Sequence, residues 1–270
     1  MTTLHPNKLL GQHFLTCAWV LPEMARAAEL TTDDTVLEIG PGTGVLTRFL
    51  ATQAKRVIAV EKDRALSAVL SVALTREKIA NVDIVTGDVL RFDFSVMPDR
   101  YKVVANIPYY LTSRLIRILL ETKKKPEVMA LTIQKEVAER IVAQCPDMNI
   151  LALSVHAYGT PEIVAEVPAS CFAPRPKVDS AIIKIRDISD AFFARRHIAS
   201  KDFFRVIRQG FSSRRKMLVN NLEQFATKKD TGQALISIGH PASVRAQELS
   251  LEEWAKLVHD MHLHDQDFPF

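Results

Sequence analysis

The sequence of 270 residues has few cysteines and no long hydrophobic run. Its three cysteines, Cys17, Cys145 and Cys171, lie far apart, are odd in number and show no metal-ligand spacing. This pattern suits a reducing interior and argues against a framework of disulfides. No segment has the length of a membrane span, and the N-terminal residues lack the continuous apolar stretch of a signal peptide. We therefore expect a cytoplasmic protein that does not bind a membrane.

Internal repeats and low-complexity segments are also lacking, and three histidines near the C-terminus have no companion cysteines. For His259, His262 and His264 we therefore predict no metal site. Hydrophobic residues make up 47% of the chain, which is enough for a substantial core. The length suits one large and one small domain, and a monomer would suffice.

From residue 35 onward, short β-branched runs alternate with segments that have apolar residues at every third or fourth position. This alternation predicts an α/β fold with a doubly wound, mostly parallel sheet. Two later runs, 151–159 and 181–186, are expected to extend the sheet as a closing pair. The expected strands are 35–40, 56–61, 82–87, 101–107 and 127–134, and the expected helices are 45–54, 64–77 and 112–125.

The pattern changes after Arg186, where the remaining segments are helical. An interruption at 210–213 divides the first of them, and Ser250 and Glu253 have the spacing of a capping box at the start of another helix. We expect Trp254 to pack in the core of that helix. The apolar positions at helical spacing are Phe204, Ile207, Phe211, Leu218 and Leu222.

We place a domain boundary near residue 187, which gives a first domain of residues 1–187 and a small helical domain of residues 188–270. Positive charge is concentrated around the start of the second. Residues 184–229 contain twelve Lys or Arg and four acids, whereas the whole chain carries a net charge of only +4. Such a concentration indicates a polyanionic partner, with a solvated basic face as the alternative.

A glycine-rich turn follows the first expected strand. Gly40, Gly42 and Gly44 form G-x-G-x-G, not the G-x-G-x-x-G of a dinucleotide site. Glycines there let the backbone approach a ligand closely, and the following helix start attracts negative charge. Glu61 ends the next strand, 21 positions after Gly40, where a carboxylate can bind ribose hydroxyls, and Asp88 follows the third strand, where it can meet an adenine edge. A nucleoside cofactor is indicated, and a tight turn with surface acids is the alternative.

The charges near this turn favour S-adenosylmethionine over NAD. No Lys or Arg lies between Gly40 and Thr47 to meet a pyrophosphate, and Glu38 adds a third acid at the same end of the sheet. A cationic sulfonium with a ribose tolerates that acidity better than two phosphates would.

The fourth expected strand ends in "ANIPYY", residues 105–110, which opens onto the same crevice. The exocyclic amine of adenine is a poor nucleophile because its lone pair is delocalised into the ring. Two acceptors on its hydrogens, the Asn106 side-chain oxygen and the Pro108 carbonyl held by the fixed φ of proline, would free that lone pair. Tyr109 can stack on a flipped base. Alignment then does most of the catalysis; the alternative is a proline-terminated strand with a capping amide.

Eight motifs in order closely resemble the small-subunit ribosomal RNA adenine N6,N6-dimethyltransferases, the kasugamycin-sensitivity family. The resemblance runs from Lys8 to about Leu257, nearly the whole chain. It implies a class I methyltransferase domain of Rossmann-like type, a small helical domain, and dimethylation of two adjacent adenines in a hairpin near the 3′ end of small-subunit RNA. The motifs are "KLLGQHFL", "LEIGPGTGVLT", "VEKD", "GDVL", "NIPYY", "QKEVAERIVAQ", "FAPRPKVDSAIIKI" and "GFSSRRKMLVNNL".

The resemblance also implies site residues. Asn106, Pro108 and Tyr109 would hold the target adenine, with Phe172 of "FAPRPKVDS" stacking on the opposite face or, alternatively, serving only in a rigid linker. The cofactor contacts would be His13, Leu15, Gly40, Gly42, Glu61, Asp88, Val89 and Asn106. The RNA contacts would be Arg205, Arg208, Arg214, Arg215 and Lys216, which give salt-sensitive affinity with little sequence information.

The chain departs from the family in a few places. Asparagine is common where this chain has His13, aspartate where it has Cys17, and a polar residue where it has Tyr110. Two alternatives remain open: a large-subunit RNA methyltransferase of the macrolide-resistance type, and a non-catalytic RNA-binding assembly factor. A DNA adenine methyltransferase is disfavoured because those usually carry D-P-P-Y, and no acid precedes this proline.

Overall fold

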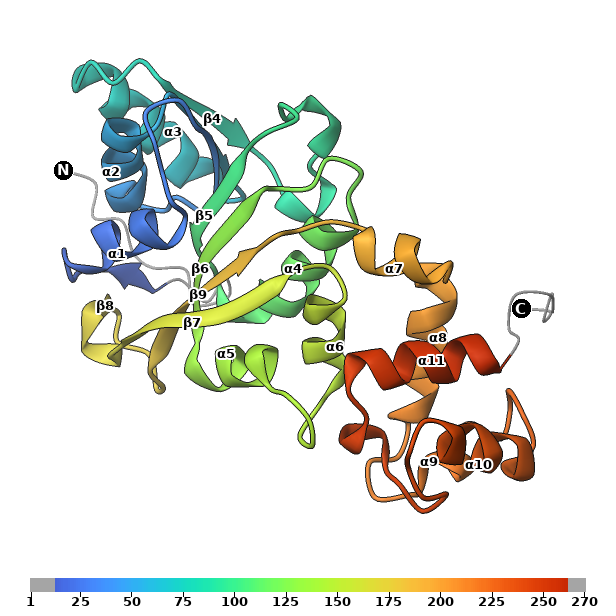
Figure 1. Cartoon of the computed structure of the whole chain (residues 1–270). Coiled ribbons are helices and arrows are strands. Elements are labelled where there is room, and N and C mark those ends of the chain that lie inside the picture. The colour runs from blue at the N-terminus through green and yellow to red at the C-terminus, as the bar shows by residue number, and fades with distance from the viewer. Residues whose placement is uncertain (1–12, 262–270) are drawn as a thin grey trace. The chain divides into compact units, whose positions relative to one another are not determined.

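The structure of the protein, a computed structural model, describes residues 13–261, which divide into two compact units (Figure 1). The first unit comprises residues up to Glu139 together with Gly159–Ile188, and the second comprises Arg140–Tyr158 together with the residues from Ser189 onward. The sequence indicated one boundary near residue 187. The structure differs in that residues 140–158 also pack with the C-terminal helices.

The first unit is built on a seven-stranded sheet. Its strands are β2 (Thr35–Ile39), β3 (Arg56–Glu61), β4 (Val82–Thr86), β5 (Lys102–Asn106), β6 (Val128–Gln134), β7 (Thr160–Val167) and β9 (Ser180–Arg186). They lie in the order β4-β3-β2-β5-β6-β9-β7. β2 to β6 are parallel, and β9 is antiparallel to both β6 and β7. The expected α/β fold and its first five strands are confirmed.

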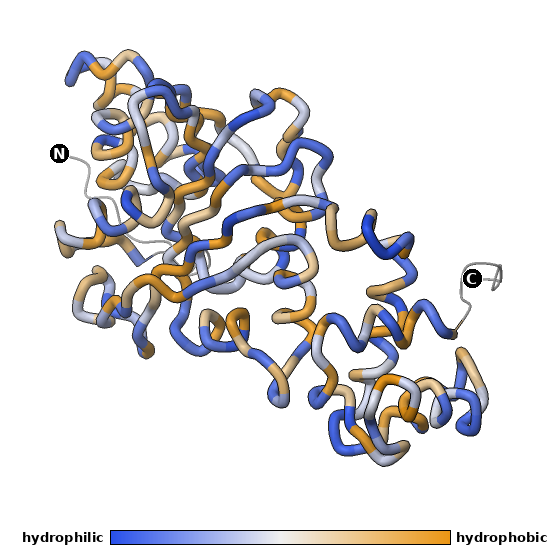
Figure 2. The backbone as a smooth tube through the Cα atoms, viewed as in Figure 1, coloured by the Kyte–Doolittle hydropathy of each residue, from blue (hydrophilic) through white to orange (hydrophobic). Residues whose placement is uncertain are grey.

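Helices cover both faces of this sheet. The segments are α1 (Val20–Ala27), α2 (Val45–Gln53), α3 (Arg64–Arg76), α4 (Thr112–Glu121) and α5 (Lys135–Val142). In Figure 1, α1, α2 and α3 lie on one side of the sheet and α4 lies on the other. Because both faces are covered, the inner strands are hydrophobic over most of their length, at 103–105 in β5 and 128–131 in β6 (Figure 2).

The expectation of a strand at 151–159 was wrong. This segment forms α6 (Ile150–His156), which belongs to the second unit. The side chain of Asn149 caps it by accepting hydrogen bonds from the backbone N–H groups of Leu151 and Ala152. The edge strand is instead β7, which carries Pro161 and two glutamates, Glu162 and Glu166, and therefore did not look like a buried strand.

A second, two-stranded sheet pairs β1 (Phe14–Leu15) with β8 (Phe172–Ala173) in antiparallel register. Beside it, Cys17 and Cys171 form a disulfide with a Cα–Cα distance of 4.9 Å. The expectation that no disulfide forms was therefore wrong. The two cysteines are 154 residues apart, and only the pairing of β1 with β8 brings them together.

The second unit is helical, as expected. Its segments besides α6 are α7 (Ala191–Arg196), α8 (Ser200–Gly210), α9 (Leu218–Asn221), α10 (Lys228–Ser237) and α11 (Leu251–Asp260). The five apolar positions predicted at helical spacing are all buried, and the Ser250–Glu253 capping box is present. Trp254 is fully buried and donates from its indole N–H to the Ala246 carbonyl. Short 3-10 turns are η2 (Val89–Arg91), η3 (Phe94–Val96), η4 (Tyr109–Leu111), η5 (Ala169–Cys171) and η6 (Ala246–Glu248).

Within residues 13–261, no helix combines the length and apolar character needed to cross a membrane. The same range contains no group of three or more side chains arranged to hold a metal ion. Of the three C-terminal histidines, His262 and His264 lie outside the described residues.

Candidate functional site

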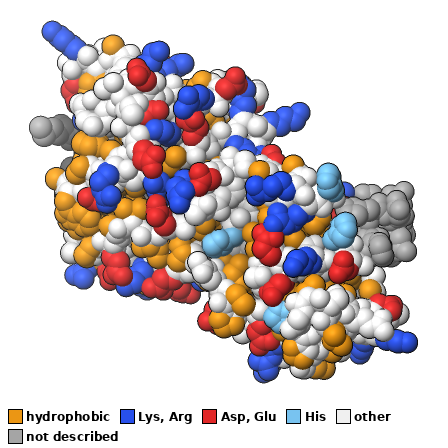
Figure 3. Space-filling model, viewed as in Figure 1, with side chains coloured by type: hydrophobic (Ala, Val, Ile, Leu, Met, Phe, Trp, Pro, Cys, Tyr) orange, Lys and Arg blue, Asp and Glu red, His pale blue; other side chains and the backbone are white. Residues whose placement is uncertain are grey.

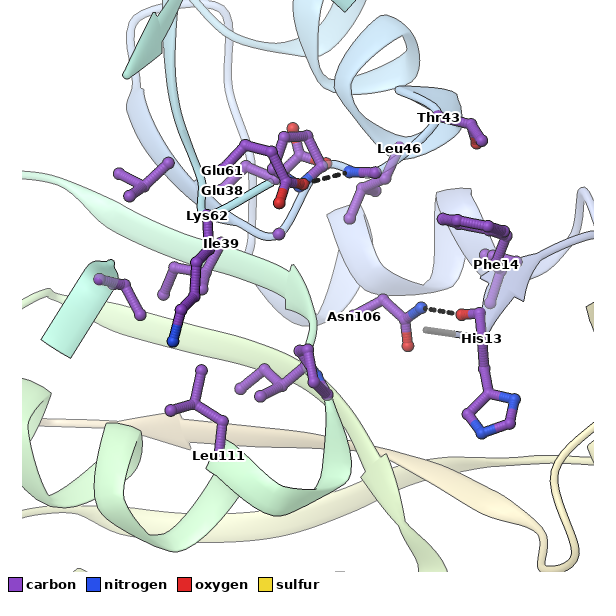
Figure 4. A pocket seen from close by; sticks show the side chains of 18 of the residues that line it. His13, Phe14, Glu38, Ile39, Thr43, Leu46, Glu61, Lys62, Asn106 and Leu111 are labelled. Atoms are coloured by element: carbon purple, nitrogen blue, oxygen red, sulfur yellow. Dashed lines mark hydrogen bonds between the residues drawn. The ribbon is translucent and has the colours of Figure 1, made fainter. Parts of the chain in front are cut away.

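A pocket opens at the carboxyl ends of β2, β3 and β5 (Figure 4). β2 and β5 are the neighbours between which the strand order reverses, the place where open α/β sheets bind ligands. The pocket brings together ten of the residues that the sequence indicated: His13, Leu15, Gly40, Gly42, Glu61, Asp88, Val89, Asn106, Pro108 and Tyr109.

The glycine turn forms the floor of this pocket. Gly40, Gly42 and Gly44 have φ angles of +67°, +56° and +80°, which L side chains rarely adopt. A Cβ added to Gly42 would lie 2.8 Å from the Phe14 ring, so glycine there also lets β1 approach. The turn therefore needs glycine for its conformation and for the packing of the strand that covers it.

Glu61 organises the turn from the end of β3. One carboxylate oxygen accepts the N–H of Gly42 (3.0 Å) and the other accepts the N–H of Asp63 (2.8 Å). Figure 4 shows the first of these bonds above the pocket. A carboxylate offers about four acceptor positions, so Glu61 keeps acceptors for the hydroxyl donors of a ribose.

Glu38 is a second carboxyl group in the pocket wall, and it is only 1% exposed. Burial raises its pKa to about 8; the charge of Glu61 adds to this rise and the Thr47 hydroxyl opposes it. Its Oε2 atom is buried without a hydrogen-bond partner in the described residues. A cationic ligand would favour the ionised form of this carboxyl group, which fits a sulfonium better than an anion.

Asp88 is held at the rim by a residue that the sequence did not single out. Lys62 donates to Oδ2 (3.0 Å), and the N–H of Leu90 donates to Oδ1 (3.0 Å). The hydrogen bond from Lys62 is the main cause of the lowered pKa of Asp88. Lys62 follows directly after β3, so its position beside Glu61 was the available signal.

Asn106 is the last residue of β5, and one hydrogen bond fixes the orientation of its amide group. Its Nδ2 donates to the His13 carbonyl oxygen (3.0 Å), as Figure 4 shows, and within residues 13–261 Oδ1 accepts no hydrogen bond. The Pro108 carbonyl already accepts the N–H of Leu111 (2.9 Å). A carbonyl oxygen has two lone pairs, so Pro108 can accept one further hydrogen bond.

Tyr109 contacts two other side chains. Its ring lies 5.6 Å from that of His13 with an interplanar angle of 27°, and its hydroxyl lies 2.9 Å from the Ser180 hydroxyl. His13 Nδ1 donates to the Pro174 carbonyl (2.6 Å), since a carbonyl can only accept. The side chain of His13 therefore contacts Tyr109, whereas its backbone contacts Asn106.

Other predicted residues lie outside the pocket. Phe172 is 4% exposed and packs in the core cluster with Leu15 and Val20, so the structure does not place it opposite Tyr109. In the second unit, Arg205 pairs with Asp202 (3.4 Å) and lies over the Phe225 ring. The exposed members of the predicted RNA-binding set are Arg208, Arg214, Arg215 and Lys216.

Comparisons with known proteins match nearly the whole chain. The family described as "Ribosomal RNA adenine dimethylase" matches residues 4–262. The chain is similar to the ribosomal RNA small subunit methyltransferase A of Dehalococcoides mccartyi, with 43% identity over 94% of this chain and 88% of that protein. It is also similar to the protein of the same name from Clostridium botulinum, with 39% identity over 93% of this chain and 92% of the relative.

Two solved structures have the same fold over most of both chains. The crystal structure of a dimethyladenosine transferase from Plasmodium falciparum superposes with a TM-score of 0.75 at 27% identity, covering 91% of this chain and 96% of that one. The 23S rRNA methyltransferase ErmE superposes with a TM-score of 0.71 at 26% identity, covering 92% of this chain and 99% of that one.

Proposed function

Since the chain belongs to the ribosomal RNA adenine dimethylase family, we propose that it transfers methyl groups from S-adenosylmethionine to N6 of two adjacent adenines in small-subunit RNA. The target would lie in a hairpin near the 3′ end, and the reaction would belong to ribosome biogenesis. One observation carries the proposal: a single pocket contains the glycine turn, the Glu61 carboxylate and the free oxygen of Asn106.

The pocket residues fit the cofactor on chemical grounds. S-adenosylmethionine supplies a methyl group already activated by its positive sulfur. Glu61 accepts the ribose hydroxyls, and Asp88, held by Lys62, faces the adenine edge. Glu38 places a carboxyl group in the same wall, and its Oε2 has no hydrogen-bond partner among the described residues; a nearby positive charge would ionise it.

The substrate amine is activated by two acceptors. Asn106 Oδ1 accepts one hydrogen of N6 and the Pro108 carbonyl accepts the other, so the nitrogen becomes tetrahedral and its lone pair leaves the ring. Tyr109 stacks on the flipped base, a contact of about 1–3 kcal/mol. As N6 bonds to the methyl carbon, the bond from that carbon to sulfur would break, S-adenosylhomocysteine would leave, and one proton of N6 would pass to solvent water. N6 would then keep one hydrogen, which only one of the two acceptors can bind. No side chain need act as a strong base, because alignment supplies most of the rate.

The exposed cations of the second unit bind the RNA backbone. Arg208, Arg214, Arg215 and Lys216 are exposed, whereas Arg205 is engaged with Asp202 and Phe225 and would contribute through the packing of the helix. Phosphate contacts position a nucleic acid without reading its sequence. The choice of substrate would then depend on the shape of the folded RNA.

The partner would be the small ribosomal subunit or its precursor, and the compartment would be the cytoplasm. The Cys17–Cys171 disulfide argues against a reducing compartment, because disulfides are rare in proteins of the cytoplasm. Alkylation of thiols in denaturant at the moment of cell lysis tests this point: one labelled cysteine is expected if the disulfide forms in the cell, and three if the compartment keeps both cysteines reduced.

The proposal is tested by incubating the protein and labelled S-adenosylmethionine with separated, unmethylated ribosomal subunits. We expect label in the small-subunit fraction, and mass spectrometry should find two methyl groups on each of two adjacent adenines. The likeness to ErmE supports a second candidate, methylation of large-subunit RNA. Label only in the large-subunit fraction would establish that candidate, and no transfer to any RNA would favour a binding factor without chemistry.

A further inference from the structure

The ring that the proposed function uses as a stacking platform has one firm anchor. Tyr109 begins η4, a single 3-10 turn, and its side chain is only half-buried. The one hydrogen bond of its hydroxyl in the described structure joins it to Ser180 Oγ at 2.9 Å. Its ring otherwise meets the ring of His13, which itself lies at the pocket edge.

Ser180 is fixed far more rigidly than Tyr109. It is fully buried and is the first residue of β9. Its backbone is in register with Gln134 of β6 on one side and with Val167 of β7 on the other. Ser180 is therefore a precise anchor, because strands on both sides fix its backbone and its short side chain has few conformations.

We propose that Ser180 is a positioning residue for the target base: its buried hydroxyl holds the hydroxyl of Tyr109 and so fixes the ring on which the adenine stacks. This inference rests on the proposed function, since it requires that a base stack on Tyr109. If the Tyr109 ring tilts, the stacked adenine tilts with it, and its N6 moves away from the Asn106 and Pro108 acceptors. Small misplacements of a reacting atom reduce catalysis strongly.

The role predicts a particular kinetic pattern. Ser180→Ala should lower kcat for methylation of RNA about tenfold or more. The KM for RNA should change by less than about twofold, because phosphate contacts dominate the affinity. The affinity for S-adenosylhomocysteine, measured by calorimetry without RNA, should also stay within about twofold.

A double-mutant cycle isolates the hydrogen bond. Ser180→Ala and Tyr109→Phe each remove one hydroxyl and keep the ring, so the double variant should be no slower than the slower single variant. Ser180→Cys keeps the shape of the side chain and a weak donor, although sulfur is larger than oxygen, and its kcat should lie between those of the wild type and Ser180→Ala. Thr132→Val is the matched control, because it removes a fully buried hydroxyl that bonds the sulfur of Met24 instead.

A readout without catalysis uses RNA that carries the fluorescent analogue 2-aminopurine at the target adenine. Stacking on Tyr109 should quench it in the wild type and less in Ser180→Ala. The proposal is overturned if Ser180→Ala retains wild-type kcat, if the two losses multiply in the double variant, or if cofactor affinity and thermal stability fall in proportion to kcat. Absence of transfer by the wild-type protein would instead overturn the proposed function, and with it the base that Ser180 is inferred to position.

Discussion

Asn106 is the residue whose geometry bears most directly on the chemistry. Its amide nitrogen is committed to the His13 carbonyl, so its oxygen has a fixed direction. Because the bond uses the backbone of His13, the replacement of the family's common asparagine by histidine does not remove it. The departure at His13 instead changes what contacts Tyr109.

Replacement of Asn106 should separate catalysis from binding. Asn106→Ala removes the acceptor, and we expect kcat to fall by about a hundredfold or more, the loss typical of one oriented polar group in an active site. Asn106→Asp should be similarly impaired, because it faces a carboxylate oxygen toward the His13 carbonyl. RNA affinity, measured by filter binding, should be nearly unchanged; an Asn106→Ala enzyme with wild-type kcat would remove the proposed acceptor.

Glu38 should make stability depend on pH. Its folded-state pKa of about 8 lies above the ordinary value of 4.5, so the folded protein binds the proton more tightly than the unfolded chain does. This contribution is complete below pH 4.5 and is lost as the pH rises through about 8.

Between pH 5 and pH 8, wild-type protein should therefore lose about 3 kcal/mol of unfolding free energy relative to Glu38→Gln, whose amide does not ionise. Denaturant unfolding at a series of pH values measures both proteins. Parallel pH profiles would mean that Glu38 titrates normally and that its environment has been misjudged.

At the scale of elements, the two-stranded sheet of β1 and β8 contributes to the wall of the pocket. β1 carries the pocket-lining residues Phe14 and Leu15, and β8 pairs with it directly. The Cys17–Cys171 disulfide joins the chain beside both strands. The position of β1 beside the pocket therefore depends on its backbone pairing with β8 and on one covalent bond.

Reduction of this disulfide should lower the free energy of unfolding by about 2–5 kcal/mol, because it releases a long loop of the unfolded chain. Cys17→Ser should unfold like the reduced wild type, whereas Cys145→Ser, which removes the exposed unpaired thiol, should unfold like the oxidised protein. Alkylation of the denatured, unreduced protein should label one cysteine. Labelling of all three would show that the disulfide is absent.

The elements that follow from sequence are those whose burial is regular. β3 was predicted with its observed bounds and β2, β4, β5 and β6 within a residue at each end. Burial makes the runs of β2, β3, β5 and β6 largely apolar, whereas β4 is a partly exposed edge strand that only its β-branched residues marked. The segment 151–159 was misread because a short apolar run does not distinguish a strand from a helix, and the decisive signal was the Asn149 cap. The disulfide depended on a pairing 154 residues apart, which spacing does not reveal.

At the scale of the whole molecule, charge is distributed rather than gathered on the face shown in Figure 3. There, Lys and Arg side chains are interspersed with Asp and Glu. Several ion pairs account for this mixture of charges, among them Arg186 with Asp187 and Arg196 with Glu252. The predicted RNA contacts therefore depend on a few exposed cations and not on the net charge of +4.

Arg214, Arg215 and Lys216 together should account for a measurable part of the salt dependence. Replacing all three with alanine should reduce the slope of log affinity against log salt by about 2 to 3, if each contacts one phosphate. Cofactor affinity should not change. A control that removes Lys55, Arg56 and Arg76, exposed cations of the first unit, should leave the slope unaltered; an equal effect of both triple variants would mean that the RNA responds only to total charge.

The residue types of the site could be predicted from the sequence. The burial and ion pairing of its carboxyl groups, and the residues that hold the pocket side chains in place, could not. Glycines and acids at strand ends mark a pocket because parallel strands end at one edge, and ten predicted residues do line it. The complete burial of Glu38, the Lys62–Asp88 pair and the Ser180–Tyr109 bond depend on side-chain packing between distant segments. Phe172, which the resemblance assigned to the base pocket, packs in the core cluster, and its contact with a base stays a prediction.

The most direct test of the account is a crystal structure of the protein with S-adenosylhomocysteine. We predict the ligand over the Gly40–Gly44 turn, with its ribose hydroxyls on Glu61 and its sulfur on the side of the pocket where Asn106 presents Oδ1. A ligand bound at another place, or an Asn106 side chain that points away from the sulfur, would contradict the central claim.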